Sequence, residues 1–131
     1  KQGNSYVIEA KSGEIDKNQG DLIFMNDVNA EIIFNNDKLI LISADNAIYN
    51  GNTFNTNFMG NVIANHEKHT VNSDKLDLLF TINLAVIYDD LIYTNPFTKL
   101  LADRMEIDLI TKTSKILMND SEKKILINYN D

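Results

Sequence analysis

Three aspartates recur at the same place in a repeated sequence block, and carboxylates at a fixed spacing are the first candidates for chemistry. Asp45, Asp74 and Asp103 follow one another at intervals of 29 residues. Paired carboxylates can act as general acid and base, or cleave glycosidic bonds, when both reach one substrate. Equivalent positions of stacked repeats lie about one repeat apart, and no histidine or activated nucleophile accompanies them. We therefore expect these aspartates to satisfy backbone N–H groups rather than to catalyse a reaction.

A second candidate is the pair of histidines in the segment His66-Glu67-Lys68-His69, which invites comparison with a zinc site. The spacing differs from that of the His-Glu-x-x-His zinc helix, because only two residues separate the histidines. In a strand, positions 66 and 69 also point to opposite faces. Since the sequence suggests no third ligand, we expect both histidines in a surface loop and no bound metal.

The composition argues against several other functions. The 131 residues include no cysteine, which removes thiolate metal sites, thiol nucleophiles and disulfides. The net charge of −7 argues against nucleic-acid binding, which needs a clustered basic surface, whereas the 12 Lys and Arg are scattered. The five glycines are isolated, so the sequence offers no phosphate-binding loop and no nucleophile elbow. We expect a protein that is not an enzyme and that carries no cofactor.

The elements that must position these residues are strands. Ile, Val, Phe, Tyr and Thr alternate with polar residues, and no long stretch keeps the apolar spacing of a helix. Asn26-Asp27, Asn50-Gly51-Asn52 and Asn95-Pro96 are typical of turns. No Pro- or Ser-rich linker divides the chain. Residues 1–131 are therefore expected to form a single all-β domain.

The 29-residue block organises these strands. Residues 42–49 recur as residues 71–78 and as residues 100–107, and a looser copy covers residues 8–15. Repeats of this size are units that bury their apolar faces by stacking on one another. The period also suits one coil of a parallel β-solenoid, so a closed structural solenoid or scaffold stays open as an alternative.

The apolar alternation breaks once within each block. Ile42 and Ala44 keep a period of two, as do Ala47 and Tyr49, but Ala44 and Ala47 are three residues apart. A β-bulge adds one residue to a strand in this way. Repeated at one place, such bulges would curl a long sheet into a trough or a partly open roll. The predicted bulges lie at Asp45-Asn46, Asp74-Lys75 and Asp103-Arg104.

The same alternation predicts an apolar interior and a hydrophilic exterior. The apolar stripe is either the closed core of a β-sandwich or the lining of an open trough that holds a lipid chain. Burial stabilises by about 0.8 kcal/mol per methylene, so a partly enclosed acyl chain would be held firmly. The stripe alone is compatible with both possibilities.

Four motifs, in their order and spacing, resemble the OstA-like periplasmic proteins of lipopolysaccharide export, which include LptA and LptC. The resemblance covers the chain from about Tyr6 to Asn119. The motifs are Ile-x-Ala-Asp-x-Ala-x-Tyr at 42–49, Phe-x-Gly-Asn-Val at 58–62, Asn-Ser-Asp-Lys-Leu at 72–76 and Leu-Ala-Asp-Arg-Met at 101–105.

The resemblance implies a fold and a function. The implied fold is a twisted open β-jellyroll of consecutive antiparallel strands with an apolar interior. Such domains stack through their edge strands into a bridge along which the acyl chains of lipopolysaccharide pass from the inner membrane to the outer membrane. The implied partners are lipopolysaccharide, other jellyroll-domain transport proteins and the inner-membrane ABC transporter complex, and the implied location is the periplasm.

Within this family, the short single domain resembles LptC more than LptA. Its upstream repeat begins almost at Lys1, which is expected for LptC without its N-terminal inner-membrane anchor. Backbone pairing with partners is expected at the terminal strands, around residues 6–10 and either 113–118 or 125–129. The interior positions expected to contact acyl chains are Ile42, Ala44, Tyr49, Phe58, Val62, Val71, Leu76, Leu78, Ile87, Met105 and Ile107.

Overall fold

Strands make up the regular structure of the computed structural model, which describes residues 5–16, 18–34, 38–118 and 126–129. The strands join into one sheet in the order β1 to β8, and β9 also pairs with β7. Among the described residues, no helix is long and apolar enough to span a membrane. The strands are β1 (Ser5–Ile15), β2 (Leu22–Phe34), β3 (Lys38–Asn50), β4 (Thr56–His66), β5 (His69–Leu79), β6 (Leu84–Thr94), β7 (Thr98–Asp108), β8 (Ser114–Leu117) and β9 (Leu126–Tyr129).

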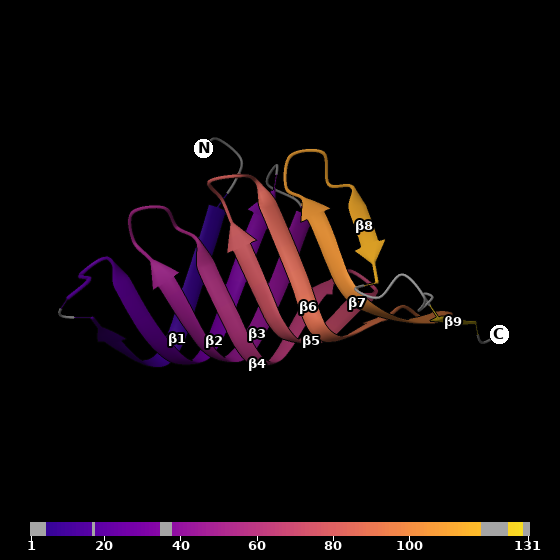
Figure 1. Ribbon diagram of the computed structural model, residues 1–131, viewed down its shortest axis with the longest axis horizontal. Coiled ribbons are helices and arrows are strands. Elements are labelled where there is room, and N and C mark those ends of the chain that lie inside the picture. The colour runs from indigo at the N-terminus through magenta and orange to yellow at the C-terminus, as the bar shows by residue number, and fades with distance from the viewer. Residues whose placement is uncertain (1–4, 17, 35–37, 119–125, 130–131) are drawn as a thin grey trace.

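The sheet is an open meander. Each of β1 to β8 pairs antiparallel with its neighbour in the sequence. Figure 1 shows the strands following one another from β1 to β8 along the long axis, and bending so that the sheet folds over into two layers. The predicted all-β, jellyroll-like fold of consecutive antiparallel strands is confirmed. The parallel solenoid is excluded, because its strands would run in one direction.

The register shifts near the middle of the strands, where the sheet bends. Opposite Asp74 of β5, strand β4 places two residues, Gly60-Asn61, and opposite Asp103 of β7, strand β6 places Asp89-Asp90. All four of these β4 and β6 residues have positive φ, between 47° and 84°. Glycine, asparagine and aspartate are the residues that adopt this left-handed conformation most readily. Their short side chains therefore allow the extra residue to be inserted.

The predicted position of the bulges was one strand away from the observed one. The register shifts do face Asp45, Asp74 and Asp103, but the extra residue lies on β4 and β6 rather than on β3, β5 and β7. The reason is a matter of parity. At the bend, successive buried residues of β5 are three positions apart, and this odd spacing interrupts the period-two alternation in the sequence. On β4 the corresponding buried residues, Phe58 and Val62, are four positions apart, so the alternation continues although the strand contains the extra residue.

Asparagine and aspartate side chains shape the hairpin turns. Asp16, Asn50, Asn95 and Asp108 each accept hydrogen bonds from the backbone N–H groups two and three residues further along. This arrangement is an Asx turn, in which a side-chain oxygen replaces a backbone carbonyl. The turn predicted at Asn50-Gly51-Asn52 is confirmed. The turn predicted at Asn26-Asp27 is wrong, because those residues lie inside β2, where Asp27 has a φ of 54°.

The hairpin loops on one side of the sheet also bond to one another. Gly51 N donates to Asp21 O at 2.7 Å, which joins the β1–β2 loop to the β3–β4 loop. Asn55 Nδ2 donates to Thr81 Oγ1 at 3.1 Å, which joins the next pair of loops. Leu109 N donates to Asn83 O at 2.9 Å and completes the series. These bonds tie four successive hairpins into one continuous rim.

Candidate functional site

The eleven predicted interior positions lie on strands β3 to β7, and none of them is exposed. Tyr49 and Ile107 are half-buried, and the other nine are buried, with exposed fractions between 1% for Phe58 and 9% for Val71. The nine belong to a single apolar cluster, and Ile107 packs against it. The alternation in the sequence therefore identified the inward face of these strands correctly.

The sheet brings several of these positions together in rows that cross the strands. Phe58 pairs with Leu76, Leu76 with Ile87, and Ile87 with Met105, so one apolar residue from each of β4 to β7 stands in line. Neighbouring strands are about 4.8 Å apart, and the row spans about 14 Å. Such a row runs across the strands, along the direction in which the sheet is extended. An elongated apolar molecule lying in the same direction could contact all four side chains of the row.

The interior also contains residues that were not among the predicted positions. Val28, Ala30 and Ile32 of β2 are only 1–3% exposed and extend the apolar cluster toward β1. Their period-two alternation was visible in the sequence. They were missed because the first copy of the repeat is the least regular.

A polar contact crosses the interior near β1. The Tyr6 hydroxyl donates a hydrogen bond to Thr56 Oγ1 at 2.7 Å, and Thr56 Oγ1 in turn donates to the backbone oxygen of Phe54 at 3.1 Å. The Tyr6 ring lies against the ring of Phe80, with centroids 5.1 Å apart. Burial raises the pKa of the Tyr6 hydroxyl well above its usual range, and the bond to Thr56 only partly opposes this effect. The contact joins the first half of β1 to the start of β4.

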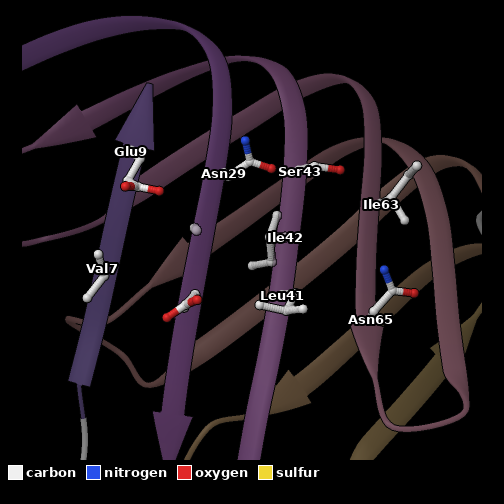
Figure 2. A pocket seen from close by; sticks show the side chains of 10 residues that line it. Val7, Glu9, Asn29, Leu41, Ile42, Ser43, Ile63 and Asn65 are labelled. Carbon is white, nitrogen blue, oxygen red and sulfur yellow. The ribbon is translucent and has the colours of Figure 1, made fainter. Parts of the chain in front are cut away.

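A shallow groove lies on the opposite, outward face of β1 to β4 (Figure 2). Its volume is about 480 Å³, and its walls combine apolar and polar side chains. Eight of the ten lining residues alternate along their strands with residues that face the core, and the other two, Ala30 and Ile42, belong to the core cluster. No sequence signal pointed to it. The lining residues are Val7, Glu9, Asn29, Ala30, Glu31, Leu41, Ile42, Ser43, Ile63 and Asn65.

The three repeated aspartates do not converge on a common point. Asp45, Asp74 and Asp103 lie on β3, β5 and β7, and one strand separates each from the next. Asp45 Oδ2 accepts a hydrogen bond from Asn61 Nδ2 at 2.8 Å, so its partner here is a side-chain amide of the bulge rather than a backbone N–H. The arrangement resembles a structural brace at the bend more than an acid–base pair.

The two histidines lie on one face, not on opposite faces. A two-residue turn separates them, and His66 pairs directly with His69 across the β4–β5 hairpin, which places their side chains on the same side of the sheet. His66 Nδ1 contacts the backbone oxygen of Leu39 at 3.0 Å, and His69 Nδ1 contacts the hydroxyl of Tyr93. Within the described residues, no group of three or more His, Cys, Asp or Glu side chains could hold a metal ion.

Comparison with known proteins gives a match in structure. No protein-family sequence model matches the chain, and no curated protein sequence matches it. A crystal structure of LptH from Pseudomonas aeruginosa, the LptA-homologous periplasmic component of the lipopolysaccharide transport device, aligns with a TM-score of 0.69. The alignment covers 97% of this chain and 96% of LptH at 10% sequence identity.

The chain has the fold of LptH. The match extends over nearly the whole of both chains, so it includes the bend and the consecutive antiparallel strands and not a single hairpin. At 10% identity the likeness is one of fold. It agrees with the open jellyroll that the motifs at residues 42–49 and 101–105 implied.

Proposed function

We propose that this chain is a non-enzymatic lipid-binding module of a lipopolysaccharide transport bridge in the periplasm. The observation that carries the proposal is the full-length likeness to LptH, a periplasmic component of such a device. The proposal is also supported by the apolar row formed by Phe58, Leu76, Ile87 and Met105. Binding an acyl chain against this row would be favourable in proportion to the apolar area that is buried. The eleven predicted interior positions are the proposed acyl-chain contacts.

Transport along a bridge requires contact between successive modules. The proposed contacts are main-chain pairings at the ends of the sheet, at β1 on one side and at β8 or β9 on the other. Unpaired strand edges accept a further strand through backbone hydrogen bonds, with little dependence on side-chain identity. The proposed partners are other jellyroll-domain transport proteins and the inner-membrane ABC transporter complex.

The position in the bridge is proposed to be that of LptC, tethered to the inner membrane, with LptA as the alternative. The two differ in what precedes the jellyroll domain. An apolar span of about twenty residues encoded before Lys1 is long enough to cross a membrane and would support the LptC position. A cleavable signal sequence there would support the LptA position.

A scaffold domain with a closed core is the second candidate. The observation that favours it is the burial of the interior, since Phe58 and Val62 are each only 1% exposed. Under this alternative, the interior contributes to stability alone. Under the lipid-binding proposal, the two layers separate enough to admit an acyl chain.

Photo-crosslinking tests the proposal directly. A photoreactive phenylalanine derivative at Tyr49 or Phe58 probes the inward face with a side chain of similar shape. Matched controls carry it at Asn57 or Lys75, which are exposed on β4 and β5. We expect lipopolysaccharide to be captured at Tyr49 and Phe58 and not at the controls. Equal capture on both faces, or no capture at either, would favour the closed scaffold.

A further inference from the structure

Strand β1 is a long, accessible edge. Its pairing with β2 keeps one register from Ser5 opposite Ile33 to Ile15 opposite Ile23, and the side chains from Glu9 to Ile15 are all exposed. Within the described residues, β1 pairs on one side only. Of the devices that protect natural sheet edges, β1 has charged side chains, at Glu9, Lys11 and Glu14, but no proline and no register shift.

The other end of the sheet has a different edge. Strand β8 pairs with one half of β7 and β9 pairs with the other half, and each of them is only four residues long. Strand β1 is eleven residues long. It therefore offers the longer uninterrupted row of outward-facing backbone N–H and C=O groups.

The charges of β1 are arranged for pairing with a copy of itself. Glu9 and Lys11 lie on either side of Ala10 and, being two residues apart, point to the same face of the sheet. A twofold axis through Ala10, perpendicular to the sheet, places Glu9 opposite Lys11 of the second copy, and Lys11 opposite its Glu9. The same axis places Ser5 opposite Ile15, so all eleven residues of β1 find a partner.

Other registers are disfavoured by the same two charges. Sliding the copies by two residues in one direction puts Glu9 opposite Glu9, and sliding them in the other direction puts Lys11 opposite Lys11. Like charges directly opposite one another destabilise an antiparallel pair. A slide of one residue is also excluded. It would place a residue whose N–H and C=O groups point toward the second copy opposite a residue whose groups point toward its own β2, so the backbone hydrogen bonds could not form.

We propose that β1 binds β1 of a second copy of this chain, antiparallel and with Ala10 on the twofold axis. The pairing joins the two sheets into one. In an antiparallel pair every second pair of facing residues exchanges two backbone hydrogen bonds, which gives about ten bonds over the length of β1. The same surface serves both copies, as in most closed dimers. This inference is independent of lipid binding, and it predicts that any other strand added at β1 competes with self-association.

Disulfide formation at Ala10 tests the twofold axis. The chain has no cysteine, so the Ala10→Cys variant carries a single thiol. In the proposed dimer the two copies of residue 10 have Cα atoms about 4.5–5.5 Å apart, which suits a disulfide. The matched control is Ser12→Cys, because its two copies are about 13 Å apart along the strands. We expect rapid dimer formation under mild oxidation for the first variant and not for the second.

Charge exchange tests the register. Glu9→Lys and Lys11→Glu each turn both cross-strand pairs repulsive, and each should raise the dimer dissociation constant by about tenfold or more. The double variant E9K/K11E restores attraction and should return to the wild-type constant. Mixing the two single variants should give heterodimers, because all four facing charges are then complementary. Sedimentation velocity at low ionic strength measures each case.

Three outcomes would overturn the proposal. They are a wild-type chain that stays monomeric at millimolar concentration, equal oxidation rates for Ala10→Cys and Ser12→Cys, and a double variant that associates as weakly as the single ones. A head-to-tail assembly through β8 or β9 gives the second outcome, because Ala10 then faces a different strand. Lipid capture at Tyr49 is scored separately, so failure of either proposal is recognised without the other.

Discussion

The hydroxyl groups of Tyr6 and Thr56 lie 2.7 Å apart, although 50 residues separate them in the sequence. Tyr6 belongs to β1, which pairs on one side only within the described residues, and Thr56 begins β4. The bond therefore holds the edge strand onto a part of the sheet that it does not pair with. It is a polar contact next to an apolar interior, where a hydrogen bond is costly to leave unmade.

Replacing Tyr6 with phenylalanine removes this bond and keeps the ring. We expect the free energy of unfolding to fall by about 1–2 kcal/mol, because Thr56, which is 0% exposed, loses a buried partner. Urea unfolding measures the change. A double-mutant cycle with Thr56→Val separates the bond from the rest of the two side chains. A coupling energy of zero would show that the contact does not stabilise the fold.

The same tyrosine predicts a loss of stability in alkali. Because burial raises the pKa of Tyr6 in the folded state, the folded chain retains a proton that the unfolded chain releases above its pKa of about 10. The contribution is complete below pH 10 and declines above it by up to about 1.4 kcal/mol per pH unit. We expect the wild type to lose more stability between pH 9.5 and 11 than Tyr6→Phe does. Parallel curves would contradict this.

Gly60 is predicted to be intolerant of a side chain. Its φ is +84°, and a Cβ atom there would lie 2.9 Å from Asp45 Oδ2. We expect Gly60→Ala to destabilise the fold by about 1–3 kcal/mol through strain at the bulge. Gly20→Ala is the matched control, since no atom lies within 4 Å of a Cβ at that position. Equal midpoints of thermal unfolding for the two variants would show that the bulge has no special requirement.

Phe58 is predicted to be central to the stability of the interior. It is 1% exposed and begins the apolar row that continues through Leu76. Phe58→Ala should cost about 3–5 kcal/mol, which is typical of a large cavity in a packed core. Phe97→Ala is the control, since Phe97 is 59% exposed and should change stability by less than about 0.5 kcal/mol. Near-equal urea midpoints would indicate that the layers do not pack around Phe58.

Much of the fold could be predicted from the sequence, because period-two alternation reports directly which face of a strand is buried. This is why the interior positions from Ile42 to Met105 were identified. The strand that carries each bulge could not be predicted, since the four-residue step from Phe58 to Val62 keeps the parity of the alternation. Asp27 illustrates a related difficulty: aspartate favours turns, but it also tolerates a left-handed residue inside a strand.

Contacts between residues far apart in the chain could not be predicted from the sequence either. Nothing near Tyr6 indicates that its hydroxyl meets Thr56, because that contact depends on how far the sheet folds over. The facing of His66 and His69 was missed for a local reason. A two-residue turn at Glu67-Lys68 reverses the chain, and residues three apart then become cross-strand neighbours.

The strictly sequential order of the strands has a consequence for folding and for evolution. From β1 to β8, each strand pairs with the strand before it and the strand after it in the sequence, and only the short β9, which pairs with β7, departs from this order. Most of the pairing energy of such a sheet comes from contacts between sequence neighbours, as in repeat proteins. Such a chain can begin to fold at any hairpin and extend in either direction. Duplicating one 29-residue unit would add two strands and lengthen the sheet by about 10 Å without altering its cross-section. Duplication or loss of whole repeats could therefore change the length of the sheet in steps of two strands.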